Sequence, residues 1–251
     1  LLGSGNTLLG SLAFFNVNGG AISGTNFNAA LTQLACFAAG TMIATTRGPV
    51  KVEDLRAGDM VALHGGGTAP AVWIGSRAVD CARHPRPETV WPIRVRAGAF
   101  GQKVGEPAMP ERDLLLSPDH AVFVEDVLIP IKFLVNESSI TQIRVPEVHY
   151  FHVELPEHDI LIAEGLPAES YLDTGDRTNF ANGDGVVRLF PDFAVSPAMA
   201  GIWEARGYAP LRAVGPEVDS VRRRLNHRAA GNGIHHIEPR GESGVARFPA
   251  N

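Results

Sequence analysis

Short apolar runs alternate with turn residues through the middle of the chain, between Cys36 and Asp173. The runs are rich in Val, Ile, Leu and Thr, and the breaks contain Gly, Pro and Asp, which is typical of β-strands joined by turns. Many short strands at this spacing predict an all-β sandwich or pseudo-barrel rather than a βαβ fold. The expected strands are Thr41–Thr45, Asp59–Leu63, Val72–Ile74, Ile93–Val95, Leu114–Leu116, Ala121–Val124, Val127–Val135, Ile140–Val145, His149–Leu155 and Ile160–Ala163, and the expected loops are Gly65–Gly67, Arg83–Pro87 and Gly101–Pro110.

The pattern changes on both sides of this β-rich region. Residues 1–35 are rich in Gly, Asn, Ser and Thr, which predicts a flexible or shallow β segment. After residue 173 the chain is first polar and then carries helical patterns at Pro197–Tyr208 and Pro216–Ala230, followed by a loose tail. We therefore expect a leader at 1–35, a β-rich domain at 36–173 and a partly helical C-terminal appendage at 174–251.

Composition and charge narrow the classes of function. The net charge is −5, so no basic field is expected to attract nucleic acid, and the arginines of the second helical pattern are interpreted as a solvated face. No apolar run reaches the roughly 18 residues that a membrane span needs. The two cysteines, Cys36 and Cys81, form no CxxC pair, so neither a disulfide framework nor a thiolate metal site is expected.

Cys36 is the first candidate for chemistry. It stands where the leader meets the β-rich domain and begins the sequence C-F-A-A-G-T, which is followed by V-E-D-L-R-A-G-D at 52–59. In a chain with so few cysteines, a thiol at such a junction is a candidate nucleophile.

Two further motifs contain histidines between apolar runs. The sequence L-L-S-P-D-H at 115–120 sets a hydroxyl and an imidazole three residues apart, and its Pro-Asp pair favours a tight turn. Such a turn would aim Ser117 and His120 into one space, with Asp119 supporting the turn. The second motif, at 149–165, is a pair of strands around a turn that carries His158.

In this order and spacing, the motifs resemble the Hint superfamily, which includes inteins, the hedgehog autoprocessing domain and bacterial intein-like domains. The resemblance covers residues 36–173 and is closer to the bacterial branch, on L-L-S-P-D-H and on F-H-V-E-L-P-E-H-D-I-L-I-A-E-G-L-P-A-E-S-Y-L-D. It implies a pseudo-two-fold horseshoe of short strands over 36–173. It also implies that the leader is the end of an N-terminal extein, the segment to be released or transferred.

The resemblance implies a self-processing reaction at the bond between Ala35 and Cys36. The thiol attacks the carbonyl of Ala35 and converts the amide into a thioester, for which the thiolate is the competent form. His120 is expected to protonate the leaving nitrogen as a general acid. Ser117 is expected to bond the scissile carbonyl or to orient the turn.

Three more residues are expected to assist. His158 matches the histidine of the family's late motif and is assigned to the second step. Asp159 is a candidate for fixing the tautomer of His158, although adjacent residues on a strand point in opposite directions. Asp59, which ends the V-E-D-L-R-A-G-D motif, is a further supporting carboxylate.

Departures from the family limit the reaction. Inteins normally end in His-Asn before Cys, Ser or Thr, whereas this chain reads L-P-A-E-S-Y at 166–171, so complete splicing is not expected. The thioester would then be captured by water, giving N-terminal cleavage, or by an external amine or thiol, giving transfer of the leader. The substrate is thus the chain's own leader, and no cofactor is expected.

Other interpretations of the same residues stay open. Cys36 could be a buried small hydrophobe, and His120 a structural histidine. Three histidines and a glutamate between 149 and 158 suggest a metal site, but strand alternation sets His149 apart and cross-strand packing is preferred. The rival functions are a cysteine hydrolase acting on other molecules and a non-catalytic β-rich module of a secreted or surface protein.

Overall fold

The computed structural model describes residues 14–15, 21–22, 35–102, 105–173, 177, 180–183, 202–203 and 205–231. Of the expected leader, only the two short strands and Ala35 fall within these ranges. The helical pattern expected at Pro197–Tyr208 lies partly outside them, and residues 202–203 and 205–206 of it are helical.

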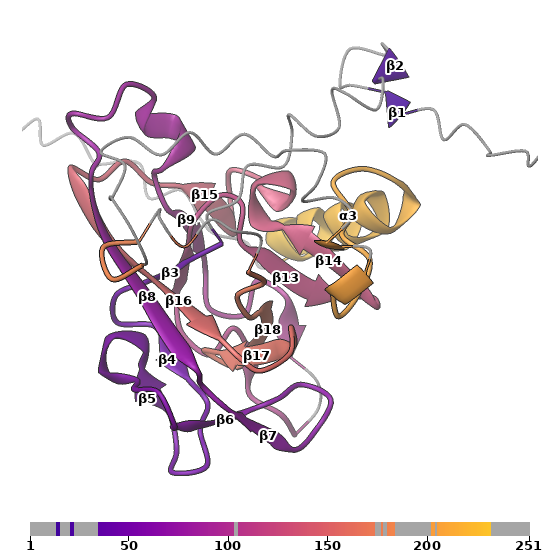
Figure 1. The fold of residues 1–251 in the computed structure, drawn as a ribbon. Helices are drawn as coiled ribbons and strands as arrows, with labels where there is room; N and C mark the ends of the chain where they lie inside the picture. The colour runs from indigo at the N-terminus through magenta and orange to yellow at the C-terminus, as the bar shows by residue number, and fades with distance from the viewer. Residues whose placement is uncertain are drawn as a thin grey trace, which may run out of the picture.

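Two six-stranded antiparallel sheets build the β-rich body (Figure 1). The first sheet has the order β15–β9–β12–β3–β16–β8, and the second has the order β14–β13–β18–β17–β4–β5. The strands of the first are β3 (Phe37–Ala38), β8 (Trp73–Asp80), β9 (Ile93–Val95), β12 (Leu114–Leu116), β15 (Ile140–Gln142) and β16 (Glu147–Glu154). Those of the second are β4 (Met42–Ile43), β5 (Val50–Lys51), β13 (Ala121–Val124), β14 (Val127–Pro130), β17 (Ile160–Ala163) and β18 (Leu166–Glu169).

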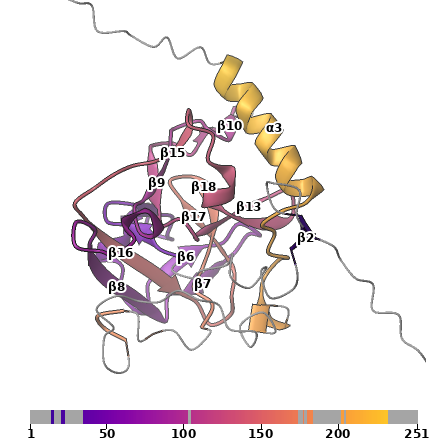
Figure 2. The same ribbon diagram turned by 90° about the horizontal axis from the view of Figure 1, so that it is seen from above.

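Smaller elements complete the fold, and the view from above in Figure 2 shows α3 lying along one side of the β-rich body. Three two-stranded hairpins pair β1 with β2, β6 with β7 and β10 with β11. Their bounds are β1 (Phe14–Phe15), β2 (Ala21–Ile22), β6 (Met60–Ala62), β7 (Thr68–Pro70), β10 (Gly101–Gln102) and β11 (Ala108–Met109). The helical elements are η1 (Val52–Asp54), η2 (Pro87–Thr89), η3 (Ile131–Leu134) and α3 (Pro216–Gly231).

The prediction of an all-β fold with a C-terminal helix is confirmed. Several details differ from the sequence pattern, and strands β3, β5, β7 and β18 were not expected. The strand expected at Val127–Val135 ends at Pro130, which has no N–H for the ladder, and the chain continues as η3. The loop expected at Gly101–Pro110 contains the hairpin β10–β11, and the strand expected at Val72–Ile74 extends to Asp80.

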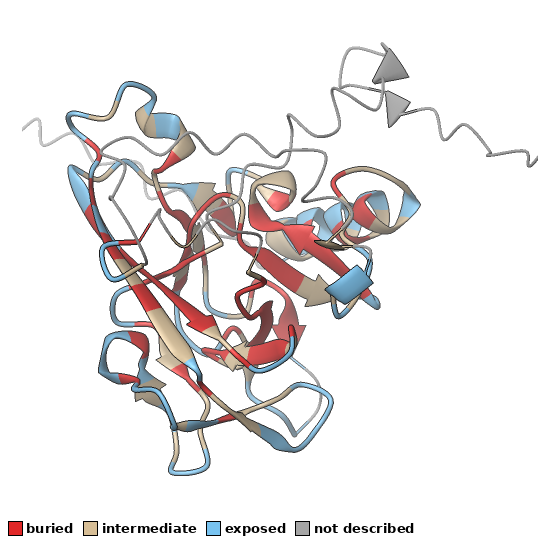
Figure 3. Cartoon of the chain, viewed as in Figure 1, coloured by how far each residue is buried: buried red, intermediate tan, exposed pale blue. Residues whose placement is uncertain are grey.

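The main core joins side chains from both sheets and from α3. Phe37 and Phe151 of the first sheet pack with Ile43 and Leu161 of the second. Figure 3 shows the buried residues gathered on the strands of the two sheets, and the exposed residues on the β6–β7 hairpin and the outer side of α3. The apolar strand faces therefore meet one another, as the alternating pattern requires.

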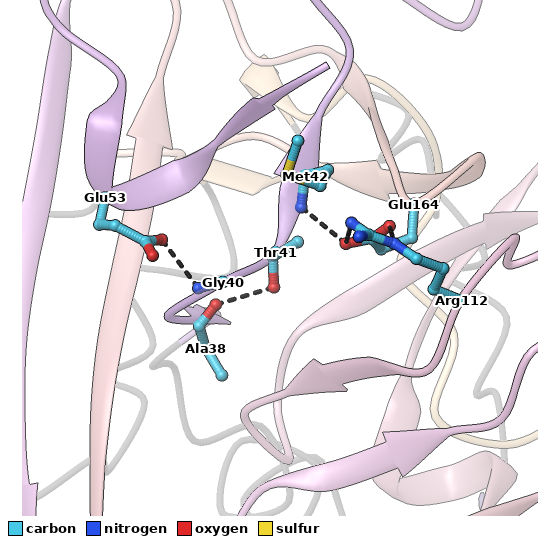
Figure 4. A network of polar contacts seen from close by, with 7 residues as sticks. All are labelled: Ala38, Gly40, Thr41, Met42, Glu53, Arg112 and Glu164. Atoms are coloured by element: carbon cyan, nitrogen blue, oxygen red, sulfur yellow. Dashed lines mark hydrogen bonds and ion pairs between the residues drawn. The ribbon is translucent and has the colours of Figure 1, made fainter.

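The chain crosses from the first sheet to the second in a tight turn between β3 and β4 (Figure 4). Gly40, at a φ of 88°, takes the left-handed conformation that favours glycine. Its N–H donates to Oε2 of Glu53 at 2.8 Å, and the Thr41 hydroxyl donates to the carbonyl of Ala38, also at 2.8 Å. Glu53 belongs to the V-E-D-L motif, so this motif and the G-T pair hold one turn.

A second carboxylate fixes the start of β4. The N–H of Met42 donates to Oε1 of Glu164 at 2.7 Å, and Arg112 binds the same carboxylate through two nitrogens at 2.8 and 2.9 Å. Such a paired geometry adds orientation as well as energy. The β3–β4 turn is therefore anchored on both sides, and the residues just before β3 have a fixed position.

The C-terminal helix belongs to the same core. Val218, Val221 and Leu225 lie on one face of α3 and are buried in the main core. Leu128 of β14 also pairs with Leu211 in a parallel bridge. Among the described residues, no helix has the length and apolar character needed to span a membrane.

Candidate functional site

Cys36 lies directly before β3 and is fully buried. Its N–H, which belongs to the peptide bond with Ala35, donates to Oγ of Ser117 at 2.7 Å. The N–H of Ser117 donates back to the carbonyl of Cys36 at 2.9 Å. The structure therefore brings together two of the residues expected from the sequence, because β12 and β3 are neighbours in the sheet.

His120 follows Ser117 in a tight turn whose closing bond runs from the N–H of His120 to the carbonyl of Ser117 at 3.1 Å. Its ring is fully buried and packs against Phe37, with 4.3 Å between the ring centroids. Burial lowers the pKa of His120 to about 3, and hydrogen bonding to the backbone of Cys36 and Glu169 opposes this effect. The imidazole is therefore neutral at pH 7 and lies beside the main chain of Cys36.

A second buried histidine, His152, lies close to Cys36 and His120. β16 pairs with β3 so that Phe151 lies opposite Phe37, and the register continues to set His152 opposite Cys36. The ring of His152 is 5.9 Å from that of His120, between centroids. Burial, together with the nearby His120 and His158, lowers the pKa of His152 well below its ordinary value. The site thus contains two neutral imidazoles.

Aromatic rings cover His152. Tyr171 meets its ring edge-on at 4.7 Å, and Phe180 stacks on it at 6.0 Å, measured between centroids. Trp73 packs against both of these rings at 5.5 and 5.1 Å. Gly75, opposite His152 in the register, leaves space for this cover, since a Cβ there would lie 2.4 Å from the Trp73 ring.

Residues after the expected domain boundary hold this cover in place. The N–H of Ala181 donates to the carbonyl of Ser76 at 2.8 Å. The side chain of Asn182 accepts from the N–H of Ser76 at 2.9 Å and donates to the carbonyl of Ile74 at 2.7 Å. These bonds along the edge of β8 fix Phe180 over the site.

His158 lies next to this group, beside the buried carboxyl of Glu169. Its Nδ1 accepts from the N–H of Tyr208 at 3.0 Å, so the neutral ring carries its proton on Nε2. That nitrogen is 3.9 Å from Oε2 of Glu169, while Oε1 accepts from the N–H of Ala121 at 2.6 Å. Burial lowers the pKa of His158 to about 4 and raises that of Glu169 to about 8. Because Ala121 follows His120, this pair supports the turn that carries His120.

The expected carboxylates near these histidines make other bonds. Asp119 forms an ion pair with Lys132 of η3. Oδ1 of Asp159 accepts from the N–H of Ile160 at 2.7 Å, and the N–H of Asp159 donates to Ser170. The Nδ1 atom of His158, which Asp159 was expected to orient, is bonded instead to a backbone N–H.

Asp59 belongs to a turn outside this group. Its Oδ2 pairs with Arg47 at 2.8 Å and accepts from the N–H of Arg56 at 2.9 Å. Cys81 is a second buried thiol, and burial raises its pKa, with Asp80 and Glu147 adding to the shift. Asp59 and Cys81 therefore each have contacts outside the group of residues around Cys36 and His120.

The most informative additions to the sequence prediction are Arg77, His152 and Glu169. Arg77 is 5% exposed and Glu169 is 2% exposed, which is rare for ionisable side chains. Of these three, only His152 had been considered from the sequence, as one of the histidines between 149 and 158 for which cross-strand packing was preferred to a metal site. Within the described ranges, no group of three or more His, Cys, Asp or Glu side chains is placed to hold a metal ion.

Comparisons with known proteins agree with these motifs. A family model described as a Hint domain matches residues 35–175. No curated protein matches the chain. Solved structures that resemble it include the gp41-1 intein (10% identity, 54% of this chain and 98% of that chain, TM-score 0.38) and the MchDnaB-1 intein (N145AA) (13%, 54% and 99%, 0.39). A bacterial intein-like domain from Clostridium thermocellum also matches (17% identity, 55% and 100%, 0.38).

Proposed function

Since this chain belongs to the Hint domain family, a family of self-processing domains, we propose that Cys36 cuts the peptide bond that joins it to Ala35. One observation carries the proposal: the nitrogen of that bond is held by Ser117 at 2.7 Å, beside the buried ring of His120. A hydroxyl thus binds the nitrogen that must leave, and an imidazole lies beside the main chain of the same residue. A peptide nitrogen departs only when it takes up a proton.

The first step is a transfer of the acyl group from nitrogen to sulfur. The thiol of Cys36 gives its proton to His120, the sulfur bonds to the carbonyl carbon of Ala35, and the C–N bond breaks as His120 returns the proton to the nitrogen. Burial lowers the pKa of His120 to about 3, so the ring is neutral at pH 7 and free to accept before it donates. The proton balance closes within the site, and the step as written requires no metal or cofactor.

The second step releases the leader, 1–35. Water attacking the thioester gives N-terminal cleavage, and an external amine or thiol gives transfer of the leader to that molecule. His158 and Glu169, next to the His120 turn, are suited to assist this step. Residues 36–173 would then be the processing domain, and 174–251 an appendage that contributes to its core and its aromatic cover.

The buried position of Cys36 weighs against a hydrolase that acts on other molecules. Such an enzyme needs an open groove at its nucleophile, whereas Cys36 is fully buried. A thiol in this position reacts most readily with a bond that is already inside the fold.

The proposal is tested by intact mass spectrometry of the purified chain at pH 7, with and without dithiothreitol or hydroxylamine. We expect a product of residues 36–251 that increases with nucleophile and is absent in Cys36→Ala. Cys81→Ala is the matched control, because it removes the other buried thiol, and it should cleave normally. A chain that stays whole under every nucleophile, or cleavage that persists in Cys36→Ala, contradicts the proposal.

A further inference from the structure

Arg77 is a buried cation on the same face of the first sheet as Cys36. The register sets Arg77 of β8 opposite Tyr150 of β16, and Tyr150 opposite Ala38 of β3. Side chains two residues apart on a strand share a face, so Cys36, next but one to Ala38, is on that face too. Cys36, Ala38 and Tyr150 belong to one buried apolar cluster, and Arg77 is 5% exposed.

The guanidinium of Arg77 interacts electrostatically with the sulfur of Cys36 within these apolar surroundings. Burial lowers the pKa of Arg77, and the negative charge available on Cys36 acts in the opposite direction. Charges attract more strongly in such surroundings than in water, because the effective dielectric constant is lower. Arg77 keeps its positive charge at physiological pH, since a guanidinium does not lose its proton in proteins.

The proposed reaction creates a need for this charge. The nucleophile is a thiolate, and burial in apolar surroundings disfavours it, as the raised pKa of the Cys81 thiol illustrates. The two imidazoles near Cys36 are weak bases, because burial lowers the pKa of His120 to about 3 and that of His152 well below its ordinary value. Negative charge on the sulfur therefore needs support from another group.

We propose that the Arg77 guanidinium stabilises the negative charge that forms on the Cys36 sulfur during attack on the Ala35 carbonyl. This inference rests on the proposed function for its consequence, but the effect on the thiol exists without cleavage. The proton path is unchanged: the thiol proton passes to His120 and then to the leaving nitrogen. Arg77 moves no proton and acts only through its fixed charge.

Among the described residues, the other ionisable groups around Cys36 do not supply a positive charge. The Tyr150 hydroxyl donates to the carbonyl of Val90 at 2.8 Å, and burial raises its pKa, so it stays neutral. His120 and His152 are neutral for the reasons given above, and Cys81 is a neutral thiol at pH 7.

The direct test is an NMR titration of the full chain, without added nucleophile, labelled at the Cβ of cysteine. The chain has two cysteines, so two signals appear, and Cys81→Ser assigns them. We expect Arg77→Met to raise the midpoint of the Cys36 thiol by at least about one pH unit, since removing a nearby opposite charge shifts a buried group by that much. Arg77→Lys, which keeps a positive charge, should leave most of the shift in place.

Arg47→Met is the control. Arg47 lies in the turn between β4 and β5, outside the first sheet, and its side chain is 59% exposed and pairs with Asp59, so solvent screens its charge. This variant should leave the Cys36 midpoint unchanged. An equal shift in Arg47→Met, or no shift in Arg77→Met, overturns the inference.

Cleavage in hydroxylamine supplies the second readout. At pH 7, Arg77→Met should cleave at least about tenfold more slowly than the unaltered chain and approach it above the new midpoint, because one pH unit is a tenfold change in thiolate. If Arg77→Met loses its fold, as judged by near-ultraviolet circular dichroism, Arg77→Lys becomes the test. A Cys36 midpoint close to that of the unaltered chain supports the inference, and a midpoint raised by about one pH unit contradicts it. If no variant cleaves but the midpoint shifts, the proposed function fails while the role of Arg77 stands.

Discussion

Glu169 allows a quantitative prediction of how stability depends on pH. It is a 2% exposed carboxyl whose Oε1 accepts from the N–H of Ala121 at 2.6 Å. Burial raises its pKa to about 8; the Ala121 bond opposes this shift and the charge of Asp119 adds to it. Glu169→Gln keeps an oxygen that can accept the Ala121 bond but removes the ionisation. The variant therefore separates the hydrogen bond from the charge.

The sign and the size follow from proton linkage. Between the ordinary pKa of 4.5 and about 8, the native chain holds a proton on Glu169 that the unfolded chain has lost. The free energy of unfolding therefore falls as pH rises, by about 1.4 kcal/mol per pH unit, or about 5 kcal/mol over the whole window as an upper limit. Between pH 6.5 and 8 the loss is about 2 kcal/mol. Buried His120 and His158, with pKa values lowered to about 3 and about 4, act in the opposite direction below pH 6.5.

Urea denaturation at pH 6.5 and pH 8.5 measures this loss, with Cys36→Ala in every chain to prevent cleavage. The chain with Glu169 should lose about 2 kcal/mol between the two pH values, and Glu169→Gln should lose far less. Glu164→Gln is the control, because Glu164 is also buried but is paired with Arg112, so its substitution should lower stability equally at both pH values. Parallel losses with and without Glu169 would refute the argument.

Three other predictions concern the site and its supports. Ser117→Ala should slow N-terminal cleavage by about 10- to 100-fold, because it leaves the buried Cys36 N–H without its acceptor, while Ser117→Thr should retain most of the rate. Leu225→Ala should lower the free energy of unfolding by about 2–5 kcal/mol in urea denaturation, since it opens a cavity in the main core. Phe180→Ala should raise the rate at which iodoacetamide labels Cys36 at least about tenfold above that in Leu225→Ala, by local opening of the cover over His152.

Much of the fold follows from local pattern. Alternating apolar positions predict the strands and their all-β arrangement. The helical period of the C-terminal segment predicts a helix at Pro216–Ala230, and the structure has α3 at Pro216–Gly231. The length of β8 was missed because its second half alternates in burial but not in polarity, with Arg77 in an inward position. An arginine normally indicates the exposed face of a strand, so no local signal marks this one as buried.

Some residues of the candidate site follow from local sequence motifs, and others depend on how the strands pair. Cys36, Ser117 and His120 were found because two short motifs contain them, and β12 and β3 are neighbours. Arg77 and His152 enter the site through the register of long antiparallel pairs, which a single sequence does not reveal. For the same reason the sequence did not reveal that Nδ1 of His158 accepts from the N–H of Tyr208, 50 residues away. The role of Asp159 in fixing the His158 tautomer stays a prediction.

Burial of the site has a chemical consequence for the order of events. Cys36 and its neighbours are enclosed by strands and by the aromatic rings of Tyr171 and Phe180, so a bulky acceptor has no direct approach while the cover is closed. In the proposed reaction the first acyl transfer needs no external molecule, since the thiol, the imidazole and the scissile bond belong to one chain. The second step does need an external molecule, the acceptor that captures the thioester. We therefore expect thioester formation to be independent of the acceptor, and capture to depend on how often the cover held by Asn182 opens.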